Sequence, residues 1–398
     1  MWTNPYDAPG SLGLPIDRED CQLIHYRAIR AAVRGLRPEA IPDSLPLAAL
    51  QERARLDGAE AYLLHPADIE GLFAGVTLAV YRTVRSLYCS RLGRSIRMVW
   101  RILSAMAQAA GTRAVPYEVV WVLCLSLEDT RRASLEVPLE RGQDTWWLGR
   151  TTPDIAIQEQ AAPRYQPTIT WCVEMGESRA LAFHIAPPWA AGEQKPLVLY
   201  DGIVALRRPL GRVATGLLWH LPKRIATTIP LSSPHRATCA RAGIEVEETA
   251  AEPPLIQAVR DRWERGVAGR TLPGGQCARL LDTYLARAHG YGPLRERERY
   301  ARELRSLVGY NQDPAWQFPL LREFLPAAAG SVTEEGVVPY DGLHYAHELL
   351  SYWPGQPVTV RRSAHMEAAA WIYLGGEILC LAYARELRRR DGSYRHFR

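Results

Sequence analysis

The spacing of apolar residues predicts helices in the first third of the chain. Val99, Ile102, Leu103 and Met106 recur at helical spacing, and Ser95 before them is a suitable N-cap. A second helix is predicted from Tyr117 to Leu127, directly after Pro116. Two short helices joined by a turn that contains glycine predict a helix-turn-helix within residues 66–137. Residues 1–65 also carry a helical pattern, to which we assign no role.

The pattern changes to β-type in residues 138–275. Two apolar runs, 145–157 and 168–184, are rich in β-formers, and Met175-Gly176-Glu177 divides the second into a hairpin. A third run, 197–206, is apolar and contains Asp201, so we predict a buried strand that ends in a functional acid. The remaining elements predicted here are a helix at 234–242, a strand at 244–246 and a helix at 255–266. This order predicts a mixed α/β layer.

The last part of the chain predicts a helical linker and a small β-barrel. Residues 276–330 alternate in charge, as solvated helices do, and residues 331–398 hold short apolar runs separated by glycines. The longest apolar run, 368–384, is interrupted by Gly375-Gly376-Glu377, which indicates a hairpin instead of a membrane span. We therefore expect a multidomain α+β protein divided at residues 1–65, 66–137, 138–275, 276–330 and 331–398, with no membrane partner.

Composition adds little by itself. The 398 residues are 47% hydrophobic and 23% charged, which is usual for a globular chain and excludes a mainly disordered one. The net charge is only +5, but 46 of the 48 basic residues are arginines, whose forked guanidinium suits phosphates and base edges. Seven scattered cysteines form no metal-binding spacing, and the N-terminus lacks a signal-peptide pattern. We expect reduced thiols and a cytoplasmic protein.

Arginine placement is more informative than the net charge. No acidic residue occurs from Gly71 to Tyr117, and Arg94, Arg97 and Arg101 are spaced to share one helical face. The tail from Arg385 to Arg398 has six arginines and two acids. Such clusters predict contact with DNA, although a solvated arginine face on an ordinary bundle is the alternative. The predicted DNA-contacting residues are Arg91, Arg94, Arg97, Arg101, Arg388, Arg389 and Arg390.

Several short motifs occur in the order found in one family. They are Trp147-Leu148-Gly149-Arg150-Thr151-Thr152-Pro153-Asp154-Ile155, Tyr165-Gln166-Pro167-Thr168 through Ser178-Arg179, Val198-Leu199-Tyr200-Asp201-Gly202, Thr271-Leu272-Pro273-Gly274, Gly309-Tyr310-Asn311, and Gly336-Val337 followed by Tyr345 and by Gly355 to Arg361. Over residues 90–390 this order resembles the transposase family of bacteriophage Mu, TnsB and TniA. The resemblance implies an RNase H-like integrase core at 138–275, a Mu-type C-terminal barrel and double-stranded DNA as partner. It also implies multimers or partner transposition proteins, and association with the bacterial nucleoid.

The resemblance implies a catalytic site of three carboxylates that hold two Mg²⁺ or Mn²⁺ ions, and here that site departs from the family pattern. The first acid aligns with Gly149, which has no side chain, and Glu174 on the next strand is the possible substitute. The second aligns with Asp201, and the third with Asp261 or, one residue earlier, Arg260. If the core were active, Asp201 and Asp261 would be metal ligands; if it is inactive, no cofactor is expected.

Three functions remain open. The first is a transposase-like protein that binds DNA or assembles a nucleoprotein complex through an inactive core. The second is an active recombinase, or a subunit of a heteromeric transposase, that performs metal-dependent strand transfer. The third is a protein-interaction scaffold without a DNA role.

Overall fold

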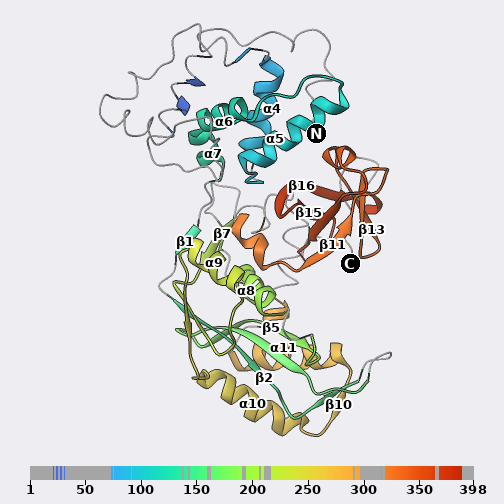
Figure 1. Cartoon of the computed structure of the whole chain (residues 1–398). Coiled ribbons are helices and arrows are strands. Elements are labelled where there is room, and N and C mark those ends of the chain that lie inside the picture. The colour runs from blue at the N-terminus through green and yellow to red at the C-terminus, as the bar shows by residue number, and fades with distance from the viewer. Residues whose placement is uncertain are drawn as a thin grey trace, which may run out of the picture. The chain divides into compact units, whose positions relative to one another are not determined.

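The chain folds into two units in the computed structural model (Figure 1). The helix–barrel unit contains residues 1–136, 328–360 and 368–397, and the core unit contains residues 137–327, 361–367 and 398. The structure describes residues 21, 24, 25, 27, 28, 31, 73–74, 76–90, 92–135, 139–141, 144–158, 163–190, 194–205, 208–209, 217–289, 292–295, 315, 319–363 and 367–387. The predicted regions at 1–65 and 276–330 therefore lie partly outside the described residues.

Four helices lie between residues 76 and 135 of the helix–barrel unit, in the part that the structure describes. They are α4 (Leu78–Tyr88), α5 (Ile96–Ala109), α6 (Tyr117–Ser126) and α7 (Glu128–Leu135). The hydroxyl oxygens of Thr77 and Ser95 accept hydrogen bonds from the backbone N–H groups of Val80 and Met98, and so cap α4 and α5. The predicted helices at Ser95 and Tyr117 are thus confirmed.

Six strands form the C-terminal barrel, which is nearly closed. They are β11 (Ala327–Ser331), β12 (Val337–Tyr340), β13 (Leu343–Ala346), β14 (Pro357–Arg361), β15 (Ala369–Leu374) and β16 (Glu377–Ala384), in the order β11-β14-β15-β16-β13-β12. A Cβ placed on Gly330 of β11 would lie 3.2 Å from Val338 of β12 and 3.3 Å from Val360 of β14. The two edges of the sheet therefore approach each other, and the barrel prediction is confirmed. Short 3-10 helices η4 (Glu348–Tyr352) and η5 (Arg385–Leu387) complete it.

The core unit is built on a mixed five-stranded sheet. Its strands are β2 (Thr145–Thr151), β4 (Thr168–Glu174), β5 (Arg179–Ala186), β8 (Arg224–Thr227) and β9 (Glu245–Glu248). Their order is β5-β4-β2-β8-β9; β2, β4 and β5 are antiparallel neighbours, whereas β8 and β9 run parallel to β2. The hairpin predicted at Met175-Gly176-Glu177 is confirmed.

Helices cover both faces of this sheet. Trp147, Trp171 and Val173 point to one face and pack with Leu255, Ile256 and Val259 of α10 (Pro254–Val267) and with α11 (Gly274–His289). On the opposite face α8 (Gln194–Ala205) packs against β4 and β5. The prediction of a strand at 197–206 is wrong, because this apolar run forms α8, whose Val198, Leu199 and Tyr200 are fully buried.

The remaining elements are small. Strands β1 (Leu139–Arg141), β7 (Leu217–Leu221) and β6 (Arg208–Pro209) form one sheet, and β3 (Ala156–Ile157) pairs with β10 (Thr271–Leu272). Helix α9 (Ser233–Arg241) connects β8 and β9, and the 3-10 helix η3 (Pro319–Phe324) packs against it.

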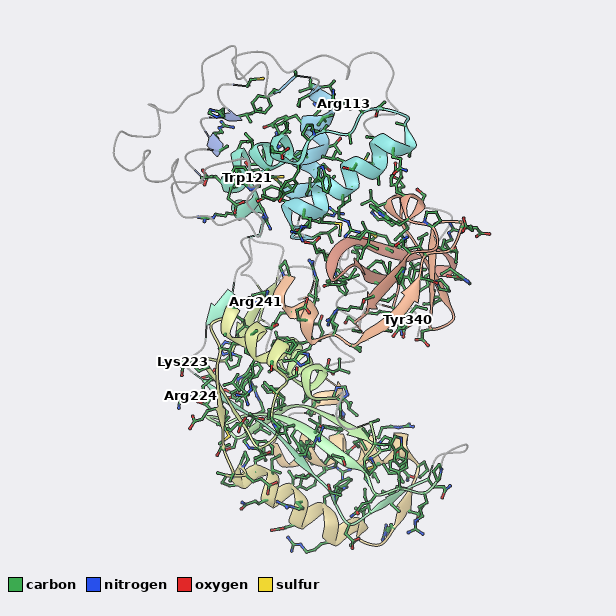
Figure 2. All side chains as sticks on the ribbon, in the orientation of Figure 1. Arg113, Trp121, Lys223, Arg224, Arg241 and Tyr340 are labelled. Carbon is green, nitrogen blue, oxygen red and sulfur yellow. The ribbon has the colours of Figure 1, made fainter. Side chains whose placement is uncertain are left out.

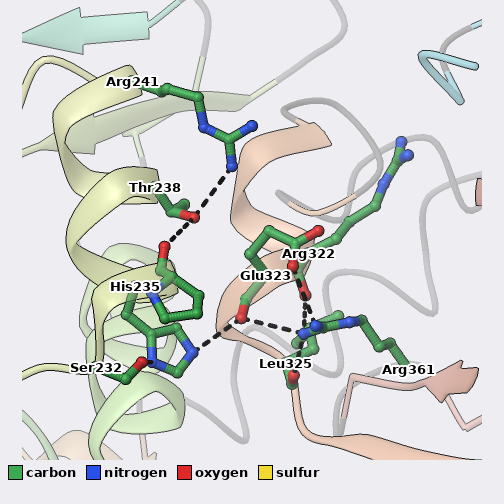
Figure 3. Close-up of polar contacts among 9 residues, drawn as sticks. Ser232, His235, Thr238, Arg241, Arg322, Glu323, Leu325 and Arg361 are labelled. Atoms are coloured by element: carbon green, nitrogen blue, oxygen red, sulfur yellow. Dashed lines mark hydrogen bonds and ion pairs between the residues drawn. The ribbon is translucent and has the colours of Figure 1, made fainter. Parts of the chain in front are cut away.

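Helix η3 is tied to the core unit from two sides (Figure 3). Nε2 of His235 in α9 lies 3.2 Å from the carbonyl oxygen of Glu323. Nδ1 of the same histidine lies 2.7 Å from the hydroxyl oxygen of Ser232. Arg361 donates from Nη1 to the carbonyl oxygens of Arg322, Glu323 and Leu325 at 3.3, 3.1 and 2.9 Å. A cation at the last carbonyls of a helix satisfies groups that have no partner within the helix.

All seven cysteines are free thiols, six of them buried and Cys89 half-buried. Among the described helices, none combines the length and the apolar character that a membrane crossing requires.

Candidate nucleic-acid interface and the acidic positions of the core

An indole ring fills the space above Gly149, the position that the resemblance aligns with the first acid. A Cβ built on Gly149 in β2 would lie 2.0 and 2.2 Å from Cζ2 and Cη2 of Trp147, and 2.7 Å from Oγ1 of Thr228. The Trp147 ring is 1% exposed, and its Nε1 donates a 3.1 Å hydrogen bond to the carbonyl oxygen of Ala251. A residue with a side chain can therefore replace Gly149 only if this buried ring moves.

Thr228, the residue that directly follows the neighbouring parallel strand β8, lies beside Gly149. Leu148 pairs with Thr227, and the N–H of Thr228 donates to the carbonyl oxygen of Leu148 at 3.1 Å. The Thr228 hydroxyl points toward the space above Gly149. The sequence pattern did not point to Thr228, because it predicted the acid-bearing strand at 197–206 with Asp201 as the second acid. The segment Ile225-Ala226-Thr227-Thr228, short and apolar after Pro222, was the available signal.

Asp201 lies within α8 and not at a strand end. Its Oδ2 is 2.7 Å from Nε2 of His184 on β5, and it is 6% exposed. His184 pairs with Thr170, and Thr170 pairs with Arg150, so this contact is on the sheet face opposite to Gly149. The nearby Cys172 thiol is fully buried, and burial, with Asp201 adding to it, raises its pKa far above the ordinary range. Asp201 is therefore a partner of His184 between a strand and a helix.

Asp261 is exposed on α10. Val259 and Trp263 on either side of it are buried against the sheet, and a helical residue two positions from each points away from their face. Arg260, the other possible alignment, forms an ion pair with Glu252. Asp201 and Asp261 consequently lie on elements that cover opposite faces of the sheet, and they cannot bind one metal ion together.

Glu174 cannot replace the first acid. It pairs with Trp146, whereas Gly149 pairs with Trp171, and an offset of three along β2 places the two side chains on opposite faces. Its carboxylate is buried and lies 3.2 Å from Nη2 of Arg179. Burial raises the pKa of Glu174, and Arg179 opposes that shift. On the same unit, Asp144 is bound to His220, with Oδ2 and Nε2 2.7 Å apart.

The acids of the core therefore do not fit a two-metal site. Within the described part of the chain, no three His, Cys, Asp or Glu side chains are grouped to hold a metal ion. A pair of divalent ions needs several converging anionic oxygens, and the space above Gly149 offers a threonine hydroxyl and an indole. No metal-dependent step can be derived from this arrangement.

Arg94 does not belong to an accessible basic face, contrary to the sequence prediction. It is 3% exposed, and its Nε donates to the carbonyl oxygen of Leu379 in β16 at 2.8 Å. Its Nη1 donates to the carbonyl oxygen of Leu87 and to Oγ of Ser90 at 3.2 and 3.1 Å. Ser95 adds a 2.6 Å hydrogen bond to Glu377. The start of α5 is thus attached to the barrel.

The other predicted arginines differ in accessibility. Arg97 is exposed, and Arg101 is half-buried, with Nη1 3.4 Å from a Cβ placed on Gly375 at the β15–β16 turn. Arg82 and Arg85 of α4 are also exposed, and so is Arg113 of the α5–α6 loop, which Figure 2 labels. Arg91, Arg388, Arg389 and Arg390 lie outside the described residues.

The second helix of the predicted helix-turn-helix is buried. Every residue from Val119 to Ser126 in α6 is buried, including Trp121, which Figure 2 labels among the helices. A recognition helix must present polar side chains to the major groove, so α6 cannot serve as one in this arrangement. The two helices are confirmed, whereas the helix-turn-helix interpretation of them stays a prediction, which the burial of α6 does not favour.

Comparison with known proteins finds a similarity for the C-terminal part of the chain. No curated protein matches the chain. Residues 323–381, from η3 through most of β16, match the protein family described as Mu transposase, C-terminal. The match covers the six-stranded barrel and agrees with the motifs from Gly336 to Arg361. The C-terminal part of the chain is therefore similar to the C-terminal domain of the Mu transposase.

Proposed function

We propose that this protein is a transposase-related DNA-binding protein whose core has lost metal-dependent catalysis. The observation that carries the proposal is the Trp147 ring in the space above Gly149, beside Thr228. Two neighbouring strands of an integrase-type site would present acids there, and in this chain they present none. The protein would act by binding DNA or by assembling a nucleoprotein complex, as copies of itself or with partner transposition proteins.

The sheet supports an RNase H-like origin for this core. An antiparallel three-stranded meander, β2-β4-β5, is followed by β8 and β9, which add in parallel on the other side of β2. Helices lie on both faces of the sheet, and the Mu-type barrel follows the core in the chain. In such an arrangement β2 and the end of β8 are adjacent, which is why Gly149 and Thr228 are the positions that matter.

DNA binding is supported by exposed cations in a stretch that contains no acids. Arg82, Arg85, Arg97 and Arg113 are exposed between Gly71 and Tyr117. Guanidinium groups that meet phosphates release counterions, so affinity falls as salt rises. Relatedness to the Mu-type transposases favours the same partner.

The test combines mobility shifts of duplex DNA with a nicking assay in Mg²⁺ or Mn²⁺. We expect salt-dependent binding without cleavage. The triple variant Arg82→Ala/Arg85→Ala/Arg97→Ala should lower the affinity for duplex DNA. It should also make the slope of log K against log salt concentration less steep, by up to about 0.9 for each phosphate that is no longer neutralised. Arg132→Ala is the matched control, because Arg132 is exposed on α7 but pairs with Glu128 at 3.9 Å.

Each part of the proposal can fail separately. Unchanged affinity in the triple variant would favour a scaffold role for this region. Metal-dependent cleavage by the purified chain, abolished by Asp201→Asn or Asp261→Asn, would overturn the inactive core. Cleavage that appears only with a partner protein would indicate a heteromeric transposase.

A further inference from the structure

One aromatic side chain of the core unit is open to solvent. Trp189, in the loop between β5 and α8, is 68% exposed. Two other large hydrophobic residues are exposed in the described part of the chain, Met175 at 37% and Leu280 at 39%. An indole that exposes most of its surface gains little stabilisation from burial and leaves its ring accessible to a ligand.

The ring is held in place rather than free. Pro187 and Pro188 precede Trp189, and the N–H of Ala190 closes a turn on the carbonyl oxygen of Pro187 at 3.0 Å. The Tyr165 ring contacts the indole edge to face, with centroids 5.6 Å apart and planes at 67°. Tyr165 is fixed in turn by two backbone hydrogen bonds to Ile157, of 2.7 and 3.0 Å. The pair is therefore pre-organised, and most of the Trp189 surface is left open.

The surroundings favour a small flat ligand over a protein. Met175 lies at the β4–β5 turn, at the other end of β5, and Leu280 lies on α11. Met175 is therefore not part of one apolar patch with Trp189, whereas a stable protein interface needs a contiguous patch. A nucleobase needs one open aromatic face, which is what Trp189 offers.

The charge near the pair is suited to phosphate. Arg164, next to Tyr165, is exposed, and so is Arg270, whose carbonyl oxygen accepts from Ala156 at the start of β3. One exposed carboxylate, Asp154, precedes β3. The other acids of the β4–β5 segment, Glu174 and Glu177, lie at the far hairpin. Among the described residues next to β3 and Tyr165, two exposed guanidinium groups therefore stand against one exposed carboxylate.

We propose that Trp189 and Tyr165 form a stacking site for an unpaired nucleobase of DNA, with Arg164 positioned for the adjoining phosphate. Duplex ends, bulges and single strands present such bases, whereas an intact duplex keeps its bases stacked inside. This site rests on the proposed DNA-binding function and extends it by naming the form of DNA that the core unit recognises.

The experiment compares binding of three fluorescent probes to the full chain: an intact duplex, the same duplex with one extrahelical thymine, and a single-stranded oligonucleotide. Trp189→Ala should weaken binding of the two probes with unpaired bases by roughly 5- to 150-fold, the range for one stacked base. Its affinity for the intact duplex should change little. Trp189→Phe should retain more of the preference, because a ring remains. Met175→Ala, an exposed apolar change at the other end of β5, is the control and should bind as the wild type does.

The outcomes separate this site from the proposed function. A wild-type chain that binds none of the probes would refute DNA binding itself. A wild-type chain that binds duplex DNA, with Trp189→Ala equally able to bind the bulged and single-stranded probes, would refute only the stacking site. Trp189→Ala that keeps its DNA affinities but loses self-association in sedimentation would assign Trp189 to a protein interface. Circular dichroism of each variant checks that the fold is retained, and crosslinking from 5-iodouracil at the extrahelical position should label the peptide that contains Trp189.

Discussion

Arg94 donates a hydrogen bond from Nε to the backbone carbonyl of Leu379, 285 residues later in the chain. The same guanidinium reaches back to Leu87 and Ser90, so one buried cation joins α4, the start of α5 and strand β16. The N-terminal helices and the C-terminal barrel thereby form one unit. In the sequence, the residues of the core unit lie between these two parts. The arginine that the helical pattern assigned to DNA is a structural tie.

Replacing Arg94 should therefore destabilise the helix–barrel unit. Arg94→Ala would leave the carbonyl oxygens of Leu379 and Leu87 without this donor, and we expect a loss of about 3 kcal/mol in the free energy of unfolding. Arg82→Ala, which removes an exposed arginine from α4, should change stability by less than about 0.5 kcal/mol. Urea unfolding of the two variants checks this, and equal stabilities would contradict the structural role of Arg94.

The arginine spacing predicted a helical face that the structure does not form. Arg94, Arg97 and Arg101 have helical spacing, but α5 begins at Ile96, so Arg94 lies before the helix and outside its periodicity. Its partner, the carbonyl oxygen of Leu379, is a backbone atom and leaves no trace in the sequence. Local pattern predicted the helix and its Ser95 cap, whereas the tertiary contact that decides the function of Arg94 could not be predicted.

The packing above Gly149 makes a second prediction. Gly149→Ala should cost about 2 kcal/mol, because the added Cβ would overlap the buried six-membered ring of Trp147. In a Trp147→Phe background the smaller ring lacks the overlapping atoms, so the same substitution should cost less by about 1 kcal/mol. A double-mutant cycle from urea unfolding measures this coupling. Gly176→Ala at the β4–β5 turn, where nothing lies within 4 Å of a Cβ, is the control.

Additive effects of Gly149→Ala and Trp147→Phe would mean that the ring does not fill this space.

The prediction that a strand at 197–206 carries an acid failed because of an ambiguous sequence pattern. Residues 197–206 are apolar in a continuous run, which a buried helix and a buried strand produce equally well. Strand β8 is only four residues long, Arg224–Thr227, and begins with a charged residue, so its pattern was too short to identify. The place of Thr228 next to Gly149 follows only from the sheet pairing between β2 and β8.

Arg361 provides a test of how η3 is held. Arg361→Met removes the donor to three carbonyl oxygens and the 3.0 Å ion pair with Glu323, and we expect a loss of about 2 kcal/mol. Arg361→Lys should lose about half as much, because one ammonium keeps the charge but not the fork. Arg224→Met is the control, since its ion pairs with Glu245 and Glu247 are exposed and should contribute little. Thermal unfolding compares the three, and a Lys variant as stable as the wild type would show that the charge alone suffices.

His347 predicts a pH dependence of stability in the helix–barrel unit. Burial, and after it the charge of Arg94, lowers the pKa of His347 to about 4. Its Nδ1 accepts a 3.0 Å hydrogen bond from the N–H of Leu349 and so caps η4, which only an unprotonated nitrogen can do. Between about pH 4 and the ordinary histidine pKa of 6.5, the unfolded chain binds this proton and the folded chain does not. Stability therefore rises with pH through that window and is lost on acidification.

The loss attributable to His347 between pH 7 and pH 4 should be about 2 kcal/mol, after allowing for solvent that reaches part of the ring. His347→Asn keeps an oxygen that can cap η4 but does not titrate, so it should remove that part of the acid loss. His344→Asn, in the neighbouring strand β13 of the same barrel, should not remove it. Chemical unfolding at about pH 7, 5.5 and 4 gives the difference between each variant and the wild type. A stability curve of the His347→Asn variant that runs parallel to the wild-type curve would show that His347 does not control acid stability, because other carboxylates and histidines titrate equally in both proteins.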